Sequence, residues 1–101
     1  MAKFTINHDV KQPVDKTFTA VEKVLSKGDD LKKYDPKIQC TFDAASKTCN
    51  IKGSQFKADL KVEPKGSGSQ IVVTVDLPLL LLPFKGKITE SLVRLFEKHL
   101  G

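Results

Sequence analysis

The residue types best suited to chemistry in this sequence are two cysteines, Cys40 and Cys49, and two histidines, His8 and His99. A cysteine thiolate can act as a nucleophile, a redox centre or a metal ligand, and a histidine can act as a general base or a ligand. A zinc site needs about four such ligands, whereas the two histidines lie near opposite ends of the chain. The sequence therefore predicts no metal site.

Signatures of catalysis or cofactor binding are also missing from the sequence. Nucleophilic catalysis needs a Ser, Cys or Thr beside a base, and only His8 is a candidate base for either cysteine. The glycine-rich segment Gly66 to Ser69 joins two predicted strands rather than opening a helix, unlike a phosphate-binding loop. We therefore expect no catalytic residue and no cofactor, and a protein that is not an enzyme.

The cysteines lie on two predicted strands, 38–43 and 48–53, joined by the turn "AASK". Pairing Asp43 with Thr48 across this turn puts five side chains on one face. We expect both thiols to be buried and unbonded, as small hydrophobic groups, and a redox role is the weaker alternative. The five side chains on this face are Ile38, Cys40, Phe42, Cys49 and Ile51.

Hydrophobic periodicity predicts the elements around this hairpin. Residues 3–10 alternate with period two, as do 56–63 and 70–77, which is typical of half-buried strands. Pro13 suits the first turn of a helix that stops at Gly28, and residues 28–37 form a polar connection with a turn at Asp35-Pro36. The apolar stripe of this helix consists of Val14, Phe18, Val21 and Leu25, widened by Thr17 and Val24.

A second helix is predicted at the C-terminus, beginning at Pro83. Its broad apolar arc consists of Phe84, Ile88, Leu92, Leu95, Phe96 and Leu100. The element order is then β-α-β-β-β-β-α, a two-layer α+β domain in which both helices cover one face of an antiparallel sheet. The first strand pairs either with the last strand or with the second, and the sequence does not decide between them.

Composition limits the classes of partner. The chain has 101 residues, which fits one domain spanning 1–101. Its net charge is +5, but the lysines are spread from Lys3 to Lys98 and Arg94 is the only arginine. Nucleic-acid sites usually concentrate basic residues on one face. We interpret the lysines as a solvated surface and do not expect nucleic acid as a partner.

The sequence also predicts where the protein acts. The N-terminal "MAKFTINHDV" lacks the apolar core of a secretory signal. The apolar run Leu77 to Phe84 is much shorter than the roughly 20 residues of a membrane-spanning helix. We therefore expect a cytoplasmic protein without a transmembrane segment.

The run of leucines between Pro78 and Pro83 is the most unusual feature of the sequence. A four-residue connector cannot point every side chain at the core, so we expect about half of these leucines to face outward. A large exposed apolar patch usually marks an interaction surface. The alternative, of equal weight, is that the leucines are buried under the first helix. The candidate contact surface is Leu79, Leu80, Leu81, Leu82 and Phe84.

The C-terminal junction resembles a known bacterial family, the polyhydroxyalkanoic acid system proteins. The similarity extends over nearly the whole chain and includes "INHDV" near the N-terminus, with His8 at the end of the strand. It implies a small non-enzymatic protein that is associated through genetic context with storage-polymer granules. The matching junction residues are Leu77, Pro78, Leu80, Leu81, Pro83, Lys85, Gly86 and Ile88.

Three functions are compatible with these features. The first is a binding or regulatory protein whose leucine-rich surface contacts a hydrophobic granule or a granule protein. The second is a carrier of a small, lipid-like ligand, because the predicted fold looks like a reduced helix-grip fold. The third is self-association, in which the leucines form the interface of a homodimer.

Overall fold

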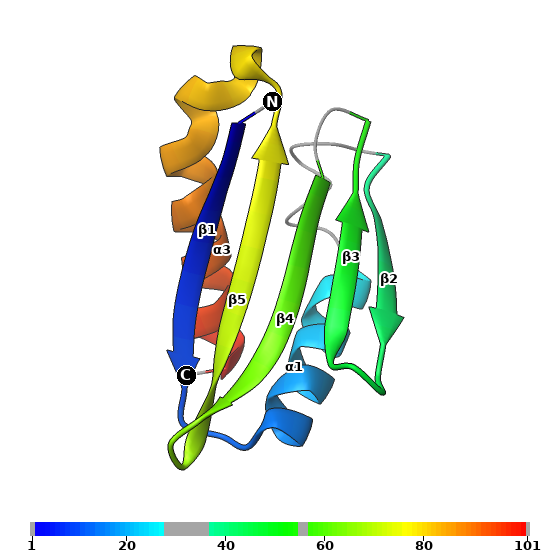
Figure 1. Cartoon of the computed structure of the whole chain (residues 1–101), viewed down its shortest axis with the longest axis vertical. Helices are drawn as coiled ribbons and strands as arrows, with labels where there is room; N and C mark the ends of the chain where they lie inside the picture. The colour runs from blue at the N-terminus through cyan, green and yellow to red at the C-terminus, as the bar shows by residue number, and fades with distance from the viewer. Residues whose placement is uncertain (1, 28–36, 55–56, 101) are drawn as a thin grey trace.

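The computed structural model of the chain describes residues 2–27, 37–54 and 57–100. Its elements form two layers, a sheet and a pair of helices that both lie on one face of it (Figure 1). The α+β order predicted from the sequence is confirmed. The elements are β1 (Ala2–Val10), α1 (Val14–Lys27), β2 (Gln39–Asp43), β3 (Thr48–Lys52), β4 (Lys57–Lys65), β5 (Gly68–Leu77), the 3-10 helix η1 (Leu79–Phe84) and α3 (Lys85–Leu100).

The sheet has five antiparallel strands in the order β1-β5-β4-β3-β2. The first strand therefore pairs with the last, with Phe4 opposite Val75, which the sequence had left open. In the β2–β3 hairpin Asp43 lies opposite Thr48, as the face pattern predicts. This topology makes β1 and β2 the two edges of the sheet.

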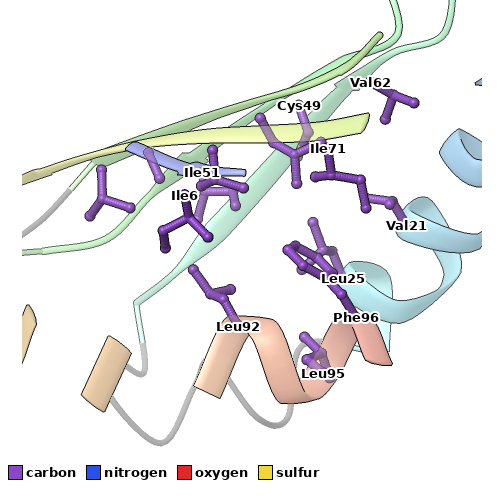
Figure 2. Packing of buried hydrophobic residues seen from close by; sticks show 14 of the residues in the cluster. Ile6, Val21, Leu25, Cys49, Ile51, Val62, Ile71, Leu92, Leu95 and Phe96 are labelled. Atoms are coloured by element: carbon purple, nitrogen blue, oxygen red, sulfur yellow. The ribbon is translucent and has the colours of Figure 1, made fainter. Parts of the chain in front are cut away.

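The core lies between the sheet and the helices. Side chains from the strands point down toward those of the helices in Figure 2, where Ile6 and Ile71 face Leu92, Leu25 and Phe96. The α1 stripe packs as predicted, with Phe18, Val21, Leu25 and Thr17 buried and Val14 and Val24 half-buried. On α3 the buried residues are Leu92, Leu95, Phe96 and Leu100.

The start of the C-terminal helix differs from the prediction. The α-helix begins at Lys85 rather than at Pro83, and Pro83 lies inside η1. Proline has no N–H and so cannot continue an α-helical hydrogen-bond ladder. The tighter 3-10 geometry uses shorter-range bonds instead, such as Leu81 N–H donating to the Pro78 carbonyl at 2.9 Å.

Some predicted features lie outside the described residues. They are the helix stop at Gly28, the polar connection as far as residue 36 with its Asp35-Pro36 turn, and the inward-facing Phe56.

Candidate apolar contact surface

The 3-10 helix η1 presents a group of large apolar side chains to solvent. We call Leu79, Leu80, Leu82 and Phe84 the leucine patch. Their exposed fractions are 68% for Leu79, 89% for Leu80, 37% for Leu82 and 49% for Phe84. Figure 1 shows η1 at one end of the molecule, where β5 ends and α3 begins. We call this the leucine end.

The geometry of η1 explains which leucine turns inward. A 3-10 helix has three residues per turn, so residues three apart share one of its three faces. Leu81 is the leucine that packs against the core, and it is half-buried. The other two faces carry Leu79, Leu80 and Leu82 and point away from the core. The outward share of the four leucines is therefore larger than the expected half, because only the face of Leu81 meets the core; Phe84, on the same face one turn later at the end of η1, is still 49% exposed.

This placement also bears on the alternative that the leucines are core. Three of the four leucines are exposed, so burial under α1 does not describe them. Of the five residues predicted as a contact surface, Leu81 serves mainly to anchor η1. The other four are all exposed within the six residues of η1, where only Leu81 and Pro83 separate them in sequence. That this surface binds something stays a prediction.

Lysines from separate strands gather near the leucine patch. On the outer face of the sheet, Lys3 and Lys57 both lie opposite Asp76, and Lys52 lies opposite Lys57. These strand ends are at the leucine end, because β5 runs from Asp76 into η1 within three residues. Three lysines and one aspartate thus form a row across four strands.

Two more lysines lie on the helix side of the patch. Lys85 and Lys87 are in the first turn of α3, which contains no acidic residue. Lys87 is exposed, and the Lys85 ammonium lies 5.2 Å from the ring centroid of Phe4. Within the described ranges, no ion pair joins any of these five lysines to a carboxylate. The leucine end therefore combines an apolar patch with a net positive charge, since five lysines stand against the single carboxylate of Asp76.

Sequence reasoning missed this cluster of lysines. The lysines appeared dispersed because Lys3, Lys52 and Lys57 are distant in sequence, and only strand register brings them together. Lys85 and Lys87 carried a signal that was available, because they directly follow the leucine run.

The two cysteines are neighbours, but they differ in exposure. Cys40 lies opposite Ile51 and Cys49 lies opposite Phe42, so the thiols are diagonal across the ladder, as predicted. Both are free; Cys49 is buried, whereas Cys40 is only half-buried. The prediction that both are buried is thus wrong for Cys40, because it lies on the edge strand β2.

The thiols also affect each other's ionisation. A hydrogen bond from Cys49 lowers the pKa of Cys40 to about 7, although partial burial opposes this effect. The same contact raises the pKa of Cys49, and burial raises it further. The first proton therefore leaves Cys40, and the resulting thiolate holds the proton on Cys49. The nearby carboxylates of Asp59 and Glu22 also raise the pKa of Cys49.

The histidines form no metal site with these thiols. His8 points toward α3, where its ring centroid is 5.7 Å from that of Phe96. Its Nε2 is buried without a hydrogen-bond partner in the described structure. His99 is exposed near the end of α3. The described residues include no group of three or more His, Cys, Asp or Glu that could hold a metal ion.

A shallow hollow of about 430 Å³ lies on the outer face of the sheet. Two of its polar side chains already bond each other, since Asn50 Nδ2 donates to Asp59 Oδ1 at 2.8 Å. Lys61, also at this hollow, is 3.5 Å from a Glu63 carboxylate oxygen. The leucine patch is the stronger candidate, because it exposes large apolar side chains to water, whereas the polar groups of the hollow bond one another.

Comparison with solved structures defines the class of protein, the helix-grip fold. A START superfamily protein from Mycobacterium smegmatis has a TM-score of 0.65 and 11% identity, covering 97% of this chain and 96% of that one. Ara h 8.0201 has a TM-score of 0.58 and 17% identity over 98% and 97%. The di-domain ARO/CYC BexL from the BE-7585A biosynthetic pathway has a TM-score of 0.72 and 9% identity, covering 98% of this chain and 46% of that one. At these identities the similarity establishes the fold alone.

The sequence identifies the family within that class. Residues 4–100 match the polyhydroxyalkanoic acid system proteins, and the chain belongs to this family. The resemblance inferred from the leucine-rich junction is thereby confirmed. No curated protein matches the chain in sequence. Across the described part of the chain, none of the helices is long and apolar enough to span a membrane.

Proposed function

We propose that this chain is a small non-enzymatic binding protein that attaches to the hydrophobic surface of polyhydroxyalkanoate granules through the leucine patch. The observation that carries the proposal is the exposure of Leu80, which leaves 89% of its surface in water. Membership of the polyhydroxyalkanoic acid system family supports the choice of partner. Contact with an apolar polyester surface would remove these side chains from water, which is favourable for apolar groups.

The way η1 is held supports a binding role. It follows β5 after Pro78 and runs directly into α3, so both of its ends belong to well-packed elements. Leu77 is fully buried on one side of η1, and Leu81 packs against the core within it. A contact surface that is already ordered loses little conformational entropy on binding. The leucine patch is thus presented as a fixed surface.

The experiment measures binding to uncharged poly(3-hydroxybutyrate) particles by cosedimentation. Burying one leucine contributes about 1.5–3 kcal/mol, so Leu80→Ser should weaken binding by about tenfold or more. Val72→Thr is the matched control, because Val72 is a half-exposed apolar residue on the outer face of β5, away from η1. Unchanged binding of both Leu79→Ser and Leu80→Ser would overturn the proposal.

A second candidate function is the carrying of a small apolar ligand. The observation that favours it is the helix-grip fold shared with the START superfamily protein. Native mass spectrometry of freshly purified protein is the test, because a carrier retains its ligand in near-stoichiometric amount. Such a ligand would place the binding function between sheet and α3 rather than on the leucine patch.

The same patch could instead join two copies of the chain. Sedimentation velocity separates this outcome from granule binding. If the leucine patch forms a dimer interface, the sedimentation coefficient rises with protein concentration, and this rise is lost in Leu80→Ser. A wild-type protein that stays monomeric yet binds the particles supports the granule surface as the partner.

A further inference from the structure

We propose that the leucine end binds an anionic phospholipid surface, with its lysines at the level of the headgroups and the leucine patch below them. The inference rests on the proposed function, in that both use the leucine patch as the contact. It adds a partner of defined chemistry, one that is apolar in its interior and negatively charged at its surface. An uncharged polyester surface would contact the leucine patch but would offer no negative charge to the lysines.

The apolar part of the argument is the shape of the leucine end. The molecule measures 39 × 23 × 21 Å, and η1 lies at one end of its long axis (Figure 1). Leu80, the most exposed leucine of η1, is flanked by Leu79 and Leu82, which share the adjoining face of η1. A narrow end with large apolar side chains can enter the boundary between headgroups and acyl chains, as interfacial helices do.

The charged part of the argument is the position of the lysines. Lys3, Lys52 and Lys57 lie on the sheet side of the patch, and Lys85 and Lys87 lie on the helix side. Asp76 is the acidic residue between the sheet lysines, and its Oδ1 has no hydrogen-bond partner in the described structure. Lysines on both sides of an apolar tip match the arrangement of an anionic headgroup layer over hydrocarbon.

The contact with the Phe4 ring gives Lys85 a role in folding, but no contact within the described residues does the same for Lys87. Positive side chains in the first turn oppose the helix dipole, and a first turn normally favours Asp or Glu. Here that turn has Lys85 and Lys87 and no acidic residue. Attraction to an external anionic surface gives Lys87 a role that helix stability does not.

The test uses vesicle cosedimentation with the full chain. One set of vesicles contains equal parts of phosphatidylglycerol and phosphatidylcholine, and the other contains phosphatidylcholine alone. Each lysine near an anionic surface strengthens binding about fivefold, so the double variant Lys85→Glu/Lys87→Glu should bind the anionic vesicles at least about 30-fold more weakly. Added salt should also weaken the binding of the wild-type protein to anionic vesicles, because it screens the charges.

The matched control is Lys16→Glu/Lys23→Glu, which changes the net charge equally on the exposed side of α1. It should retain most of the binding to anionic vesicles. Because Lys85 also lies over the Phe4 ring, the single variant Lys87→Glu separates lost charge from disturbed packing and should lose about fivefold. Circular dichroism checks that every variant is folded.

The outcomes separate this inference from the proposed function. Retained binding of Lys85→Glu/Lys87→Glu to uncharged polyester particles, with loss of binding to anionic vesicles, supports both. Wild-type binding to polyester but to neither kind of vesicle overturns the lipid inference and leaves the proposed function standing. Equal binding to both kinds of vesicle, or equal losses in the control variant, also overturns it.

Discussion

The two ends of this molecule differ in how their side chains are placed relative to solvent. At the leucine end, apolar and positively charged side chains face solvent. At the other end, which we call the hairpin end, the β4–β5 turn meets the connection between β1 and α1, and polar groups are satisfied inside the protein. There Thr17 and Ser69, exposed by only 0% and 1%, lie with their hydroxyl oxygens 2.6 Å apart.

The hairpin end is closed by short contacts. Ser69 Oγ donates to the Gln12 carbonyl at 2.8 Å, which leaves the Thr17 hydroxyl to donate to Ser69 Oγ at 2.6 Å, with Thr17 Oγ1 also 3.2 Å from the Gln12 carbonyl oxygen. A side chain at position 68 would place its Cβ 2.3 Å from the Val10 carbonyl oxygen, so only glycine fits there. The glycine-rich turn thus has a structural purpose, namely a close approach between two parts of the backbone.

The charges follow the same division. At the hairpin end Asp9 accepts hydrogen bonds from Lys65 and Gln70, each at 3.0 Å. Lys47 lies 3.2 Å from Asp15 at the start of α1. The five lysines of the leucine end make no such pair within the described part of the chain. The polar groups of the hairpin end are therefore paired within the protein, whereas the leucine end exposes apolar side chains and lysines without carboxylate partners among the described residues.

The largest expected effect is at the hairpin end. Gly68→Ala should destabilise the protein by about 3 kcal/mol, because backbone must move to relieve the contact with the Val10 carbonyl. Gly66→Ala is the control: Gly66 has a φ of 60° with open space around it, so only backbone strain of about 1–2 kcal/mol is added. Urea unfolding measures both, and equal losses would contradict the assigned close approach.

The next prediction compares two neighbouring leucines. Leu81→Glu should cost about 2 kcal/mol or more of stability, because its side chain packs against the core and a buried charge is unfavourable. Leu80→Glu should leave the melting temperature nearly unchanged and abolish association with an apolar surface. Thermal melting and particle binding are measured on each variant. If both variants unfold, the leucine patch is part of the core and the contrast between the two ends fails.

The cysteines of the β2–β3 hairpin differ in exposure, and their labelling rates test that difference. Cys40 should react with iodoacetamide in the folded protein, with a rate that rises through a pKa of about 7 because Cys49 hydrogen bonds to its thiolate. Cys49 should react only on denaturation, since it is buried and its pKa is raised. Mass spectrometry of labelled peptides assigns the site. Rapid labelling of Cys49 in the native state would contradict the inward orientation of its side chain.

A smaller effect is expected from reversing a charge at the leucine end. Lys87→Glu should raise stability by about 0.3–1 kcal/mol, because it replaces a positive charge by a negative one in the first turn of α3. Lys65→Glu at the hairpin end should lower stability, since it replaces the partner of Asp9 by a like charge. Urea unfolding at low salt gives the sign of the change in unfolding free energy for each variant. A loss of stability in Lys87→Glu would show that this lysine contributes to folding.

The smallest effect is the response of Asp9 to acid. Hydrogen bonds from Lys65 and Gln70 lower its pKa below the ordinary value of 3.8. Its contribution to stability is therefore complete above the pKa of the unfolded chain and is lost as the pH falls through the lower, folded value. Asp9→Asn should flatten the stability profile in that acidic range and leave the neutral range almost unaffected. An unchanged acid profile would show that these exposed hydrogen bonds contribute nothing measurable.

The sequence by itself determined most of the fold. Period-two alternation located the strands, and the stripe from Val14 to Leu25 gave the inward face of α1. The register of the β2–β3 hairpin followed from requiring one apolar face, since a shift of one residue would turn every side chain over. The leucine-rich junction indicated the family. These features are local, so short-range patterns are enough to specify them.

Only the tertiary structure decided how distant segments meet. The pairing of β1 with β5 brings Lys3 opposite Asp76, and β4 brings Lys57 to the same aspartate, so lysines that are scattered in sequence form one row. The 3-10 geometry of η1 decided that Leu81 turns inward while Leu80 turns outward. The position of β2 at an edge left Cys40 half-exposed although its face points inward. Alternation gives the face of a residue, but its exposure depends on what packs against that face, and this is fixed only when the chain has folded.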